Sequence, residues 1–362
     1  MVKVAVAFAG VVSLGIGFVP TVRAAEPPKA PAGIVSESAP YAADAKSSIE
    51  RLDPALDALL APDAVVELLA SGFNWSEGPV WVPARQALLF SDVPENRVYQ
   101  WKEGVGVSVG LEPSGFTGVG FTGREPGSNG LALDPQGRLV LAQHGDRRVA
   151  RLAADGKTFE TIVARTEGKR FSSPNDLCYD RAGNLFFTDP PYGLPKDTPQ
   201  ETEFHGVYRL GTDGVLTVIA RDLTRPNGIA LSPDERTLYV GNSDGKAPWV
   251  KAYTLNVDGS VAGSRIFFDG TELIARTKRR GGFDGLKVDR AGNVWTTGPG
   301  GVLILNAEGK HLGTILTGRA TANCAFGGAD GRTFYVTADE ALLRVRTQVV
   351  GAGLDAGAGA AR

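Results

Sequence analysis

The sequence predicts an all-β fold, a six-bladed β-propeller in which four-stranded blades surround a central channel. Three observations support this fold class. One strand–turn–strand motif occurs six times, its copies start 39 to 57 residues apart, and further strand-like segments lie between them. A repeat of that length built from short strands is typical of propeller blades. The six copies begin at Glu77, Asn129, Asn175, Asn227, Asp284 and Asn323.

Each copy of the motif has the pattern of a β-hairpin. The copy NGLALDPQGRLVLAQH, which starts at Asn129, contains an apolar run, a turn with Asp and Gly, and a second apolar run. Short runs rich in β-branched and aromatic residues indicate strands, and Asp-x-x-Gly is turn chemistry. Segments such as RVYQW (97–101) and GVYRL (206–210) bring each repeat to about four strands. A β-sandwich would not need six copies of one hairpin, and a parallel β-helix would have much shorter turns.

Two segments before the first repeat are expected to pack on the ring. A strand around residues 64–69 is expected to pair with the last blade, because closing the ring removes exposed strand edges. Residues 48–60 are predicted to form a short helix outside the ring.

The N-terminal residues have the features of an export signal. Lys3 precedes an apolar run over residues 4–19, and the small residues near Ala24 suit cleavage before Ala25. Residues 1–24 are therefore predicted to be a signal peptide and the protein to be exported, either periplasmic or secreted. A retained membrane anchor is the alternative, although a spanning helix needs roughly 20 apolar residues. Residues 25–48 are predicted to be a flexible leader, 49–350 the propeller and 351–362 a disordered Gly/Ala tail.

Composition narrows the classes of partner. The formal net charge of -2 provides no basic surface for nucleic acid and no polybasic patch for a membrane. A small molecule is therefore the expected partner. The only cysteines, Cys178 and Cys324, fall in repeats on opposite sides of the predicted ring. We expect them to be buried, unpaired thiols rather than a disulfide.

The first residue of each repeat is expected to lie at one end of the central channel. Asn before Gly can be explained by turns that need a positive φ. That explanation does not cover Glu77 and Asp284, because two carboxylates crowded in a buried channel repel each other. A divalent cation among carboxylate and amide oxygens removes this difficulty. The oxygen donors suit Ca²⁺ best, with Mg²⁺, Mn²⁺ and Zn²⁺ as alternatives, Zn²⁺ being the least suited because it prefers His and Cys.

The predicted chemistry is hydrolysis. A cation with open positions would polarise a carbonyl and activate water, and Asp284 or Glu77 would accept the proton. Asn129, Asn323 and His144 are predicted to contact substrate, with a structural role as the alternative for His144. Arg147 and Arg148 are expected to be a solvated pair, with binding of a substrate carboxylate as the alternative. The loops at residues 189–192 and 242–244 are predicted to form the rim of the pocket.

Several segments also carry a family resemblance that spans about residues 64–348. The chain resembles the SMP-30/gluconolactonase/luciferin-regenerating-enzyme family, and specifically its bacterial gluconolactonase branch. The matching segments are FNWSEGPVW (73–81), AQHGDRRVAR (142–151), FSSPNDLCYD (171–180), FFTDPPYG (186–193), RPNGIALSPDERTLYV (225–240) and FDGLKVDRAGNVWTTGPGGV (283–302).

The resemblance implies a six-bladed propeller with a central divalent cation, commonly Ca²⁺, and lactone hydrolysis. It implies that Glu77, Asn227 and Asp284 are metal ligands, that Asn175 is a ligand or touches substrate, and that Asp176 is an adjacent site residue, which we expect to contact substrate. Ser173 stands where the animal members have Arg, so their form of sugar recognition is not expected here.

The leading prediction from the sequence is thus metal-dependent hydrolysis of a sugar lactone. Hydrolysis of other esters or organophosphates is one alternative, because the same cation would serve either electrophile. A propeller that binds a ligand without chemistry is the other, because one fold hosts many functions.

Overall fold

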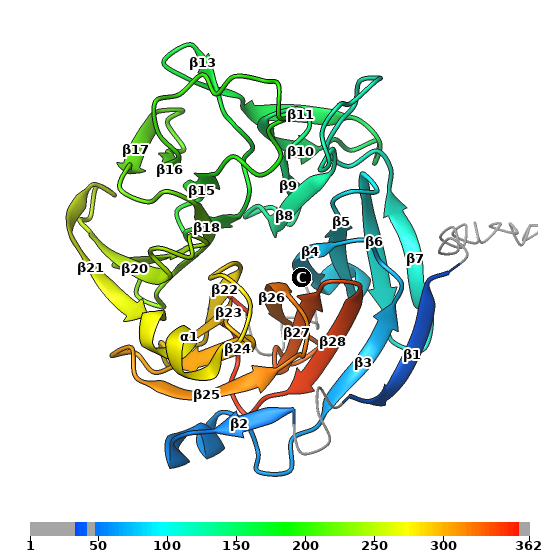
Figure 1. Ribbon diagram of the computed structural model, residues 1–362. Coiled ribbons are helices and arrows are strands. Elements are labelled where there is room, and N and C mark those ends of the chain that lie inside the picture. The colour runs from blue at the N-terminus through cyan, green and yellow to red at the C-terminus, as the bar shows by residue number, and fades with distance from the viewer. Residues whose placement is uncertain (1–32, 42–47, 355–362) are drawn as a thin grey trace, which may run out of the picture.

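The computed structural model describes residues 33–41 and 48–354. Within these residues, six antiparallel sheets of four or five strands stand around a central axis, like the blades of a propeller (Figure 1). The predicted fold class is confirmed. The predicted signal peptide at residues 1–24 lies outside the described residues. No helix in the described part of the chain is long and apolar enough to cross a membrane.

The first three blades follow one another along the chain, each running from its innermost to its outermost strand. Blade one contains β4 (Ser76–Val82), β5 (Ala87–Asp92), β6 (Arg97–Lys102) and β7 (Gly106–Leu111). Blade two contains β8 (Ser128–Leu133), β9 (Leu139–Gln143), β10 (Arg148–Leu152) and β11 (Phe159–Val163). After a two-stranded ribbon of β12 (Arg165–Thr166) and β13 (Lys169–Arg170), blade three contains β14 (Leu177–Tyr179), β15 (Leu185–Asp189), β16 (Gly206–Leu210) and β17 (Leu216–Ala220).

The last two of the remaining three blades also include strands from the N-terminal side of the chain. Blade four contains β18 (Pro226–Leu231), β19 (Thr237–Asn242), β20 (Trp249–Leu255) and β21 (Val261–Asp269), and is followed by helix α1 (Thr271–Thr277). Blade five contains β22 (Leu286–Val288), β23 (Val294–Gly298), β24 (Gly301–Leu305) and β25 (His311–Leu316), with β2 (Ile49–Arg51) at its outer edge. Blade six contains β26 (Thr321–Gly327), β27 (Thr333–Ala338) and β28 (Ala341–Arg346).

The ring is closed by an early strand, as predicted. Strand β3 (Val66–Ser71) pairs antiparallel with β28, so that Leu342 faces Ala70 and Val345 faces Val66. Blade six therefore takes its fourth strand from the N-terminal side of the domain. This closure leaves no gap between the first and last blades, because β26 also contacts β4.

Three predictions about the chain ends need correction. The segment expected to be a flexible leader contains β1 (Val35–Pro40), which adds a fifth strand to blade six by pairing with β3. The short helix expected at 48–60 is present only over Pro54–Ala58, as the 3₁₀ helix η1, which buries Leu56 against blade five, and the start of the range is strand β2. The residues expected to begin a disordered tail are ordered as far as 354, because Gly351 bridges to Asp289 and the Ala352 N–H donates to Val288 O.

The glycine that follows the first residue of most repeats has a packing function. The N–H of Gly130 donates to Asn175 O at 2.7 Å, and that of Gly228 donates to Asp284 O at 3.1 Å. A Cβ on Gly228 would lie 2.1 Å from the same carbonyl oxygen. Neither glycine has a positive φ. Glycine is therefore needed at these two positions for the close approach of neighbouring inner strands, and not for the turn conformation that the Asn-Gly pattern indicated.

The cysteines are unpaired, as predicted. Cys178 lies in β14 of blade three and Cys324 in β26 of blade six, and neither forms a disulfide. Burial raises the pKa of both thiols, so neither is activated as a nucleophile.

We predict that the closing strand is a main determinant of stability. Leu69 of β3 is 1% exposed and packs between blades one and six in a cluster with Phe73, Trp81 and Leu342. Leu69→Ala is expected to lower the free energy of unfolding by about 2–5 kcal/mol, because it removes buried methyl groups and leaves a cavity. Val65→Ala, at an exposed position beside the same strand, is expected to change it by less than about 0.5 kcal/mol. Chemical denaturation measures both, and equal midpoints for the two variants would contradict this role.

Candidate active site

A cavity of about 230 Å³ opens at the end of the channel where the repeats begin. Five of the six first-position residues line it: Glu77, Asn129, Asn175, Asn227 and Asp284. Each stands at or just before the start of an inner strand, so the six-fold repeat brings residues far apart in the sequence to one place. The cavity also includes Trp75, Glu125, Tyr192 and Ser243, which come from loops between blades or strands.

The cavity contains hydrogen-bond acceptors that have no donors. Among the buried side-chain atoms without a partner in the described residues are Oδ1 of Asn129, Asn175, Asn227 and Asp284. Leaving a polar group buried and unpaired typically costs about 1–3 kcal/mol. Four such oxygens lining one cavity therefore suit a partner that supplies hydrogen-bond donors or positive charge.

The amide nitrogens of two of these asparagines are in contact with neighbouring side chains. Asn227 Nδ2 donates to Ser243 Oγ at 3.1 Å, and Ser243 Oγ donates in turn to Phe283 O at 2.5 Å. Asn175 Nδ2 lies 3.4 Å from Nε2 of His144. Because each amide nitrogen has a neighbouring side chain as its partner, the amide oxygens are the atoms that have none.

The surroundings of the two carboxylates at this end of the channel, Glu77 and Asp284, disfavour their ionised forms. Burial, with a smaller contribution from the charge of Asp176, raises the pKa of Glu77 to about 8. Burial and then the charge of Glu77 raise the pKa of Asp284 well above its ordinary value. Glu77 accepts hydrogen bonds from Trp75 Nε1 at 3.3 Å and from the Gly78 N–H at 3.1 Å, which offset this only in part. Without a positive charge between them, the pair resists full ionisation.

The donor set fits a hard divalent cation. Two carboxylates and two or three amide oxygens are ligands of the type that Ca²⁺ takes in proteins. Among the described residues, no group of three or more His, Cys, Asp or Glu is placed to hold a metal. An ion at this position would therefore depend on the asparagine oxygens as well as on Glu77 and Asp284.

Two residues predicted to touch substrate lie outside the lining of this cavity. Asn323 Nδ2 donates to Asp176 Oδ2 at 3.4 Å, which joins blade six to blade three across the channel. Lys287 Nζ lies 3.9 Å from the same carboxylate oxygen. Asp176 and Asn323 are 2% and 1% exposed. They link opposite blades inside the channel, so the structure gives them a supporting position instead of a surface for substrate.

His144 is close to the site but does not line it. It is completely buried, and its Nδ1 lies 3.0 Å from Glu125 Oε2. Glu125 does line the cavity. The sequence did not indicate Glu125, because it lies in a Gly-rich loop outside the repeated motif and only its contact with His144 distinguishes it.

Arg147 and Arg148 were predicted to be a solvated pair, and this prediction is wrong. Arg147 is 5% exposed, and its Nε donates to Phe171 O at 2.6 Å. Arg148 joins a network of polar side chains, donating from Nε to Gln143 Oε1 at 2.7 Å. Both side chains are used inside the protein, so neither is placed to bind a substrate carboxylate. The two predicted rim loops do contribute to the cavity, through Tyr192 and Ser243.

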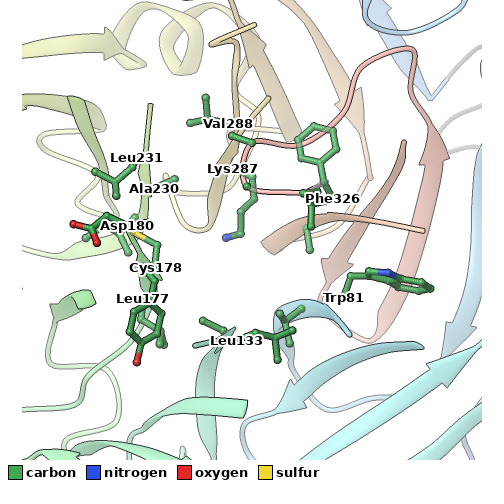
Figure 2. A pocket seen from close by; sticks show the side chains of 18 of the residues that line it. Trp81, Leu133, Leu177, Cys178, Asp180, Ala230, Leu231, Lys287, Val288 and Phe326 are labelled. Carbon is green, nitrogen blue, oxygen red and sulfur yellow. The ribbon is translucent and has the colours of Figure 1, made fainter. Parts of the chain in front are cut away.

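A second, larger cavity of about 500 Å³ lies at the opposite end of the channel. Figure 2 shows its largely apolar wall, with Leu133, Leu177, Leu231, Phe326 and Trp81 around the amino group of Lys287. None of the buried unpaired polar atoms in the described residues belongs to its lining. The smaller cavity, which is lined by the unpaired polar oxygens, is therefore the better candidate for an active site.

Comparison with known proteins assigns the chain to a family. A profile described as the SMP-30/gluconolactonase/LRE-like region matches residues 75–340, which is most of the propeller. The chain belongs to the SMP-30/gluconolactonase/LRE-like family. It is 39% identical over 310 residues to a gluconolactonase of Zymomonas mobilis, covering 84% of this chain and 87% of that protein. It is 28% identical to a pentonolactonase of Haloferax volcanii, covering 75% of this chain and 84% of that protein.

Solved structures of family members have the same fold. The chain superposes on a gluconolactonase of Xanthomonas campestris with a TM-score of 0.74 and 36% identity, covering 86% of this chain and 97% of that one. A regucalcin of Agrobacterium tumefaciens, described as a calcium-binding protein, superposes with a TM-score of 0.61 at 19% identity, covering 80% of this chain and 95% of that one. That second likeness supports the fold alone.

The raised pKa of Glu77 predicts how stability depends on pH when divalent cations are chelated. Because the pKa is about 8 in the folded protein and near 4.5 in an unfolded chain, the folded state binds the proton more tightly. Its stabilising contribution is complete below about pH 4.5 and is lost as the pH rises to about 8. In the Glu77→Gln variant, the fall in the free energy of unfolding from pH 5 to pH 8 should be smaller than in the wild type by at least about 1 kcal/mol.

Urea titrations at each pH, with chelator and then with saturating Ca²⁺, measure this difference. Ca²⁺ should abolish most of the fall in the wild type, because bound cation favours the ionised carboxylates. Identical pH dependence in the wild type and Glu77→Gln with chelator would contradict the electrostatic account of the pair.

Proposed function

We propose that this protein is a divalent-cation-dependent lactonase that hydrolyses a sugar lactone such as gluconolactone. The observation that carries the proposal is the cavity in which Glu77 and Asp284 meet unpaired amide oxygens. The family supports the reaction class, because relatives covering most of the chain are named gluconolactonase and pentonolactonase.

The residues that would hold the cation are Glu77, Asn175, Asn227 and Asp284, with Asn129 beside them. All offer oxygen, which favours Ca²⁺, with Mg²⁺ or Mn²⁺ as alternatives. When bound, such an ion supplies a Lewis acid that polarises the lactone carbonyl. Ser243 keeps the amide oxygen of Asn227 directed into the cavity through the hydrogen bond to Asn227 Nδ2.

The other lining residues would orient the lactone. The Tyr192 hydroxyl is buried without a well-aligned partner, so it is available to a sugar hydroxyl or the ring oxygen. The Trp75 ring lines the same cavity, while its Nε1–H is directed to Glu77. Because the walls are formed by fixed strand ends and loops, the lactone would be held in one orientation and partly shielded from water.

The sequence-based hypothesis assigned the role of proton acceptor to Asp284 or Glu77. Both carboxylates are needed as ligands in the arrangement proposed here. Glu77 already accepts two hydrogen bonds, from Trp75 and Gly78, and the unpaired oxygen of Asp284 faces the cation position. A ligand oxygen is a weak base, because the cation stabilises its negative charge.

Organophosphate hydrolysis remains a second candidate with specific support. The chain is 29% identical over 165 residues to a diisopropyl-fluorophosphatase of Loligo vulgaris, although the match covers 43% of this chain and 47% of that protein. A polarising cation would serve a phosphoryl group as it serves a carbonyl. We further propose that the protein works outside the cytoplasm, periplasmic or secreted, on the strength of the signal-like residues 1–24.

We predict that lactonase activity requires both the cation and Asp284. Chelation should abolish hydrolysis of gluconolactone, and added Ca²⁺ should restore it. Asp284→Asn should lower kcat/KM by about 10²-fold or more, because it removes a charge that holds the ion opposite the developing oxyanion. Asp63→Asn, at an exposed position, is the matched control and should behave as the wild type. The assay follows acid release at constant pH.

Full activity after complete chelation would contradict the cation requirement. Cation binding without hydrolysis of gluconolactone, a pentonolactone, a simple ester or a fluorophosphate would instead support a propeller that only binds its ligand.

A further inference from the structure

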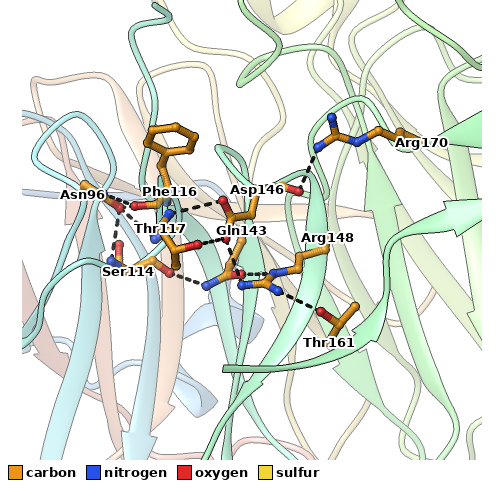
Figure 3. Close-up of polar contacts among 10 residues, drawn as sticks. Asn96, Ser114, Phe116, Thr117, Gln143, Asp146, Arg148, Thr161 and Arg170 are labelled. Carbon is orange, nitrogen blue, oxygen red and sulfur yellow. Dashed lines mark hydrogen bonds and ion pairs between the residues drawn. The ribbon is translucent and has the colours of Figure 1, made fainter. Parts of the chain in front are cut away.

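The loop that carries Glu125 is fastened to blade one and blade two at its beginning. This loop, residues 112–127, joins β7 to β8. Oδ1 of Asn96 accepts the N–H groups of Ser114, Gly115 and Phe116 at 2.7–3.1 Å. Figure 3 shows this cluster together with the bond from Thr117 Oγ1 to Asp146 Oδ2, at 2.7 Å. The first third of the loop is therefore rigidly held.

Strand β9 and Arg148 extend the same network. Gln143 Nε2 donates to Ser114 O at 2.9 Å, and Arg148 bridges Gln143 Oε1 and Asp146 Oδ2 (Figure 3). These buried and half-buried contacts explain why Arg148 does not face solvent. They fix the loop relative to the turn that carries His144 and Asp146.

The end of the loop is fixed by backbone bonds. The Gly127 N–H donates to Val93 O at 2.9 Å, and the His144 N–H donates to Gly127 O at 3.1 Å. Glu125 is two residues from this anchor. Its side chain is 30% exposed, so a water molecule can reach it.

The carboxylate of Glu125 is oriented by His144. Oε2 lies 3.0 Å from His144 Nδ1, which is an ion-pair distance, although the two atoms do not have the geometry of a hydrogen bond. Burial raises the pKa of Glu125, but the contact with His144 outweighs it, so the pKa is lowered overall. Glu125 is thus the carboxylate that lines the cavity without being one of the proposed cation ligands, and its side chain is in contact with an imidazole.

The tautomer of His144 follows from its other neighbour. With Asn175 Nδ2 as the donor, Nε2 of His144 would accept, and a ring proton on Nδ1 would face Glu125. One imidazole therefore orients two groups, the amide of a proposed cation ligand and the carboxylate of Glu125. This arrangement parallels the way in which carboxylates and histidines orient each other in hydrolytic sites.

We propose that Glu125 is the general base of the lactonase reaction and that His144 is the residue that positions it. The inference rests on the proposed function. Glu125 accepts one proton from water while the water oxygen bonds to the lactone carbonyl carbon. The ring C–O bond then breaks, and Glu125 returns the proton to the departing ring oxygen, which becomes a hydroxyl. The product is the open hydroxy acid, and the enzyme is regenerated.

Glu125→Gln tests this role directly. The kcat for gluconolactone is expected to fall by about 10²–10⁴-fold, because the amide cannot accept the proton. The affinity for Ca²⁺, measured by titration calorimetry, is expected to stay within about threefold of the wild type. Glu112→Gln, at the exposed start of the same loop, is the matched control and should have the wild-type kcat.

Chemical rescue distinguishes a base from a structural residue. Glu125→Ala leaves space for a small acid, and added formate is expected to restore part of the lost kcat in a concentration-dependent way. His144→Gln alone should lower kcat. In a protein that already carries Glu125→Gln, the same substitution should change kcat by less than about threefold, because His144 then has no base to orient.

Three results would overturn the proposal. One is a wild-type kcat in Glu125→Gln, and the second is a loss of Ca²⁺ affinity above about tenfold in that variant, which would make Glu125 a ligand. The third is a lost kcat in Glu125→Ala that formate does not restore. Failure of the proposed function itself is distinct, because the wild-type protein would then hydrolyse no lactone at all.

Discussion

The site depends on one electrostatic constraint, which is that Glu77 and Asp284 share a buried cavity with oxygen atoms that cannot donate to them. Each carboxylate alone could be accommodated by hydrogen bonds, as Glu77 partly is through Trp75 and Gly78. Together, and with the amide oxygens of Asn175 and Asn227 unpaired beside them, they form a region of uncompensated negative potential. The cation proposed above would compensate this potential, because the carboxylates and the unpaired amide oxygens would be its ligands.

The propeller satisfies this constraint because its inner strands meet closely. Glycines such as Gly130 and Gly228 let the backbone of one blade donate to the first residue of the next. That contact places successive first residues at the same level around the axis. A side chain on Gly228 would separate the blades and move Asp284, so the packing of the ring and the geometry of the site depend on the same positions. Asp176, Lys287 and Asn323 link opposite sides further along the channel.

The sequence was informative wherever function coincided with the repeat. The repeat predicts the number of blades, the closing strand, the unpaired cysteines, and the convergence of Glu77 and Asp284. It was less informative where a contact depends on a loop outside the repeat. Glu125 is not visible in the sequence because nothing in its loop marks it, and its importance appears only from its distance to His144. The burial of Arg147 was missed for a similar reason, since its partner, the Phe171 carbonyl, lies in the connection to the next blade.

Residues 25–60 show another limit of sequence patterns. Strands β1 and β2 add to the outer edges of complete blades through backbone hydrogen bonds, which need no distinctive side chains. The short 3₁₀ helix η1 then follows β2 and takes up only part of the segment where a helix was expected.

The proposed cation would occupy the mouth of the channel between Glu77 and Asp284. An anomalous difference map from crystals grown with Ca²⁺, recorded at a long X-ray wavelength, tests it most directly. The account predicts one peak in contact with the carboxylates of Glu77 and Asp284 and the amide oxygens of Asn175 and Asn227. No peak there at saturating Ca²⁺, in a protein whose cavity is otherwise unchanged, would contradict it.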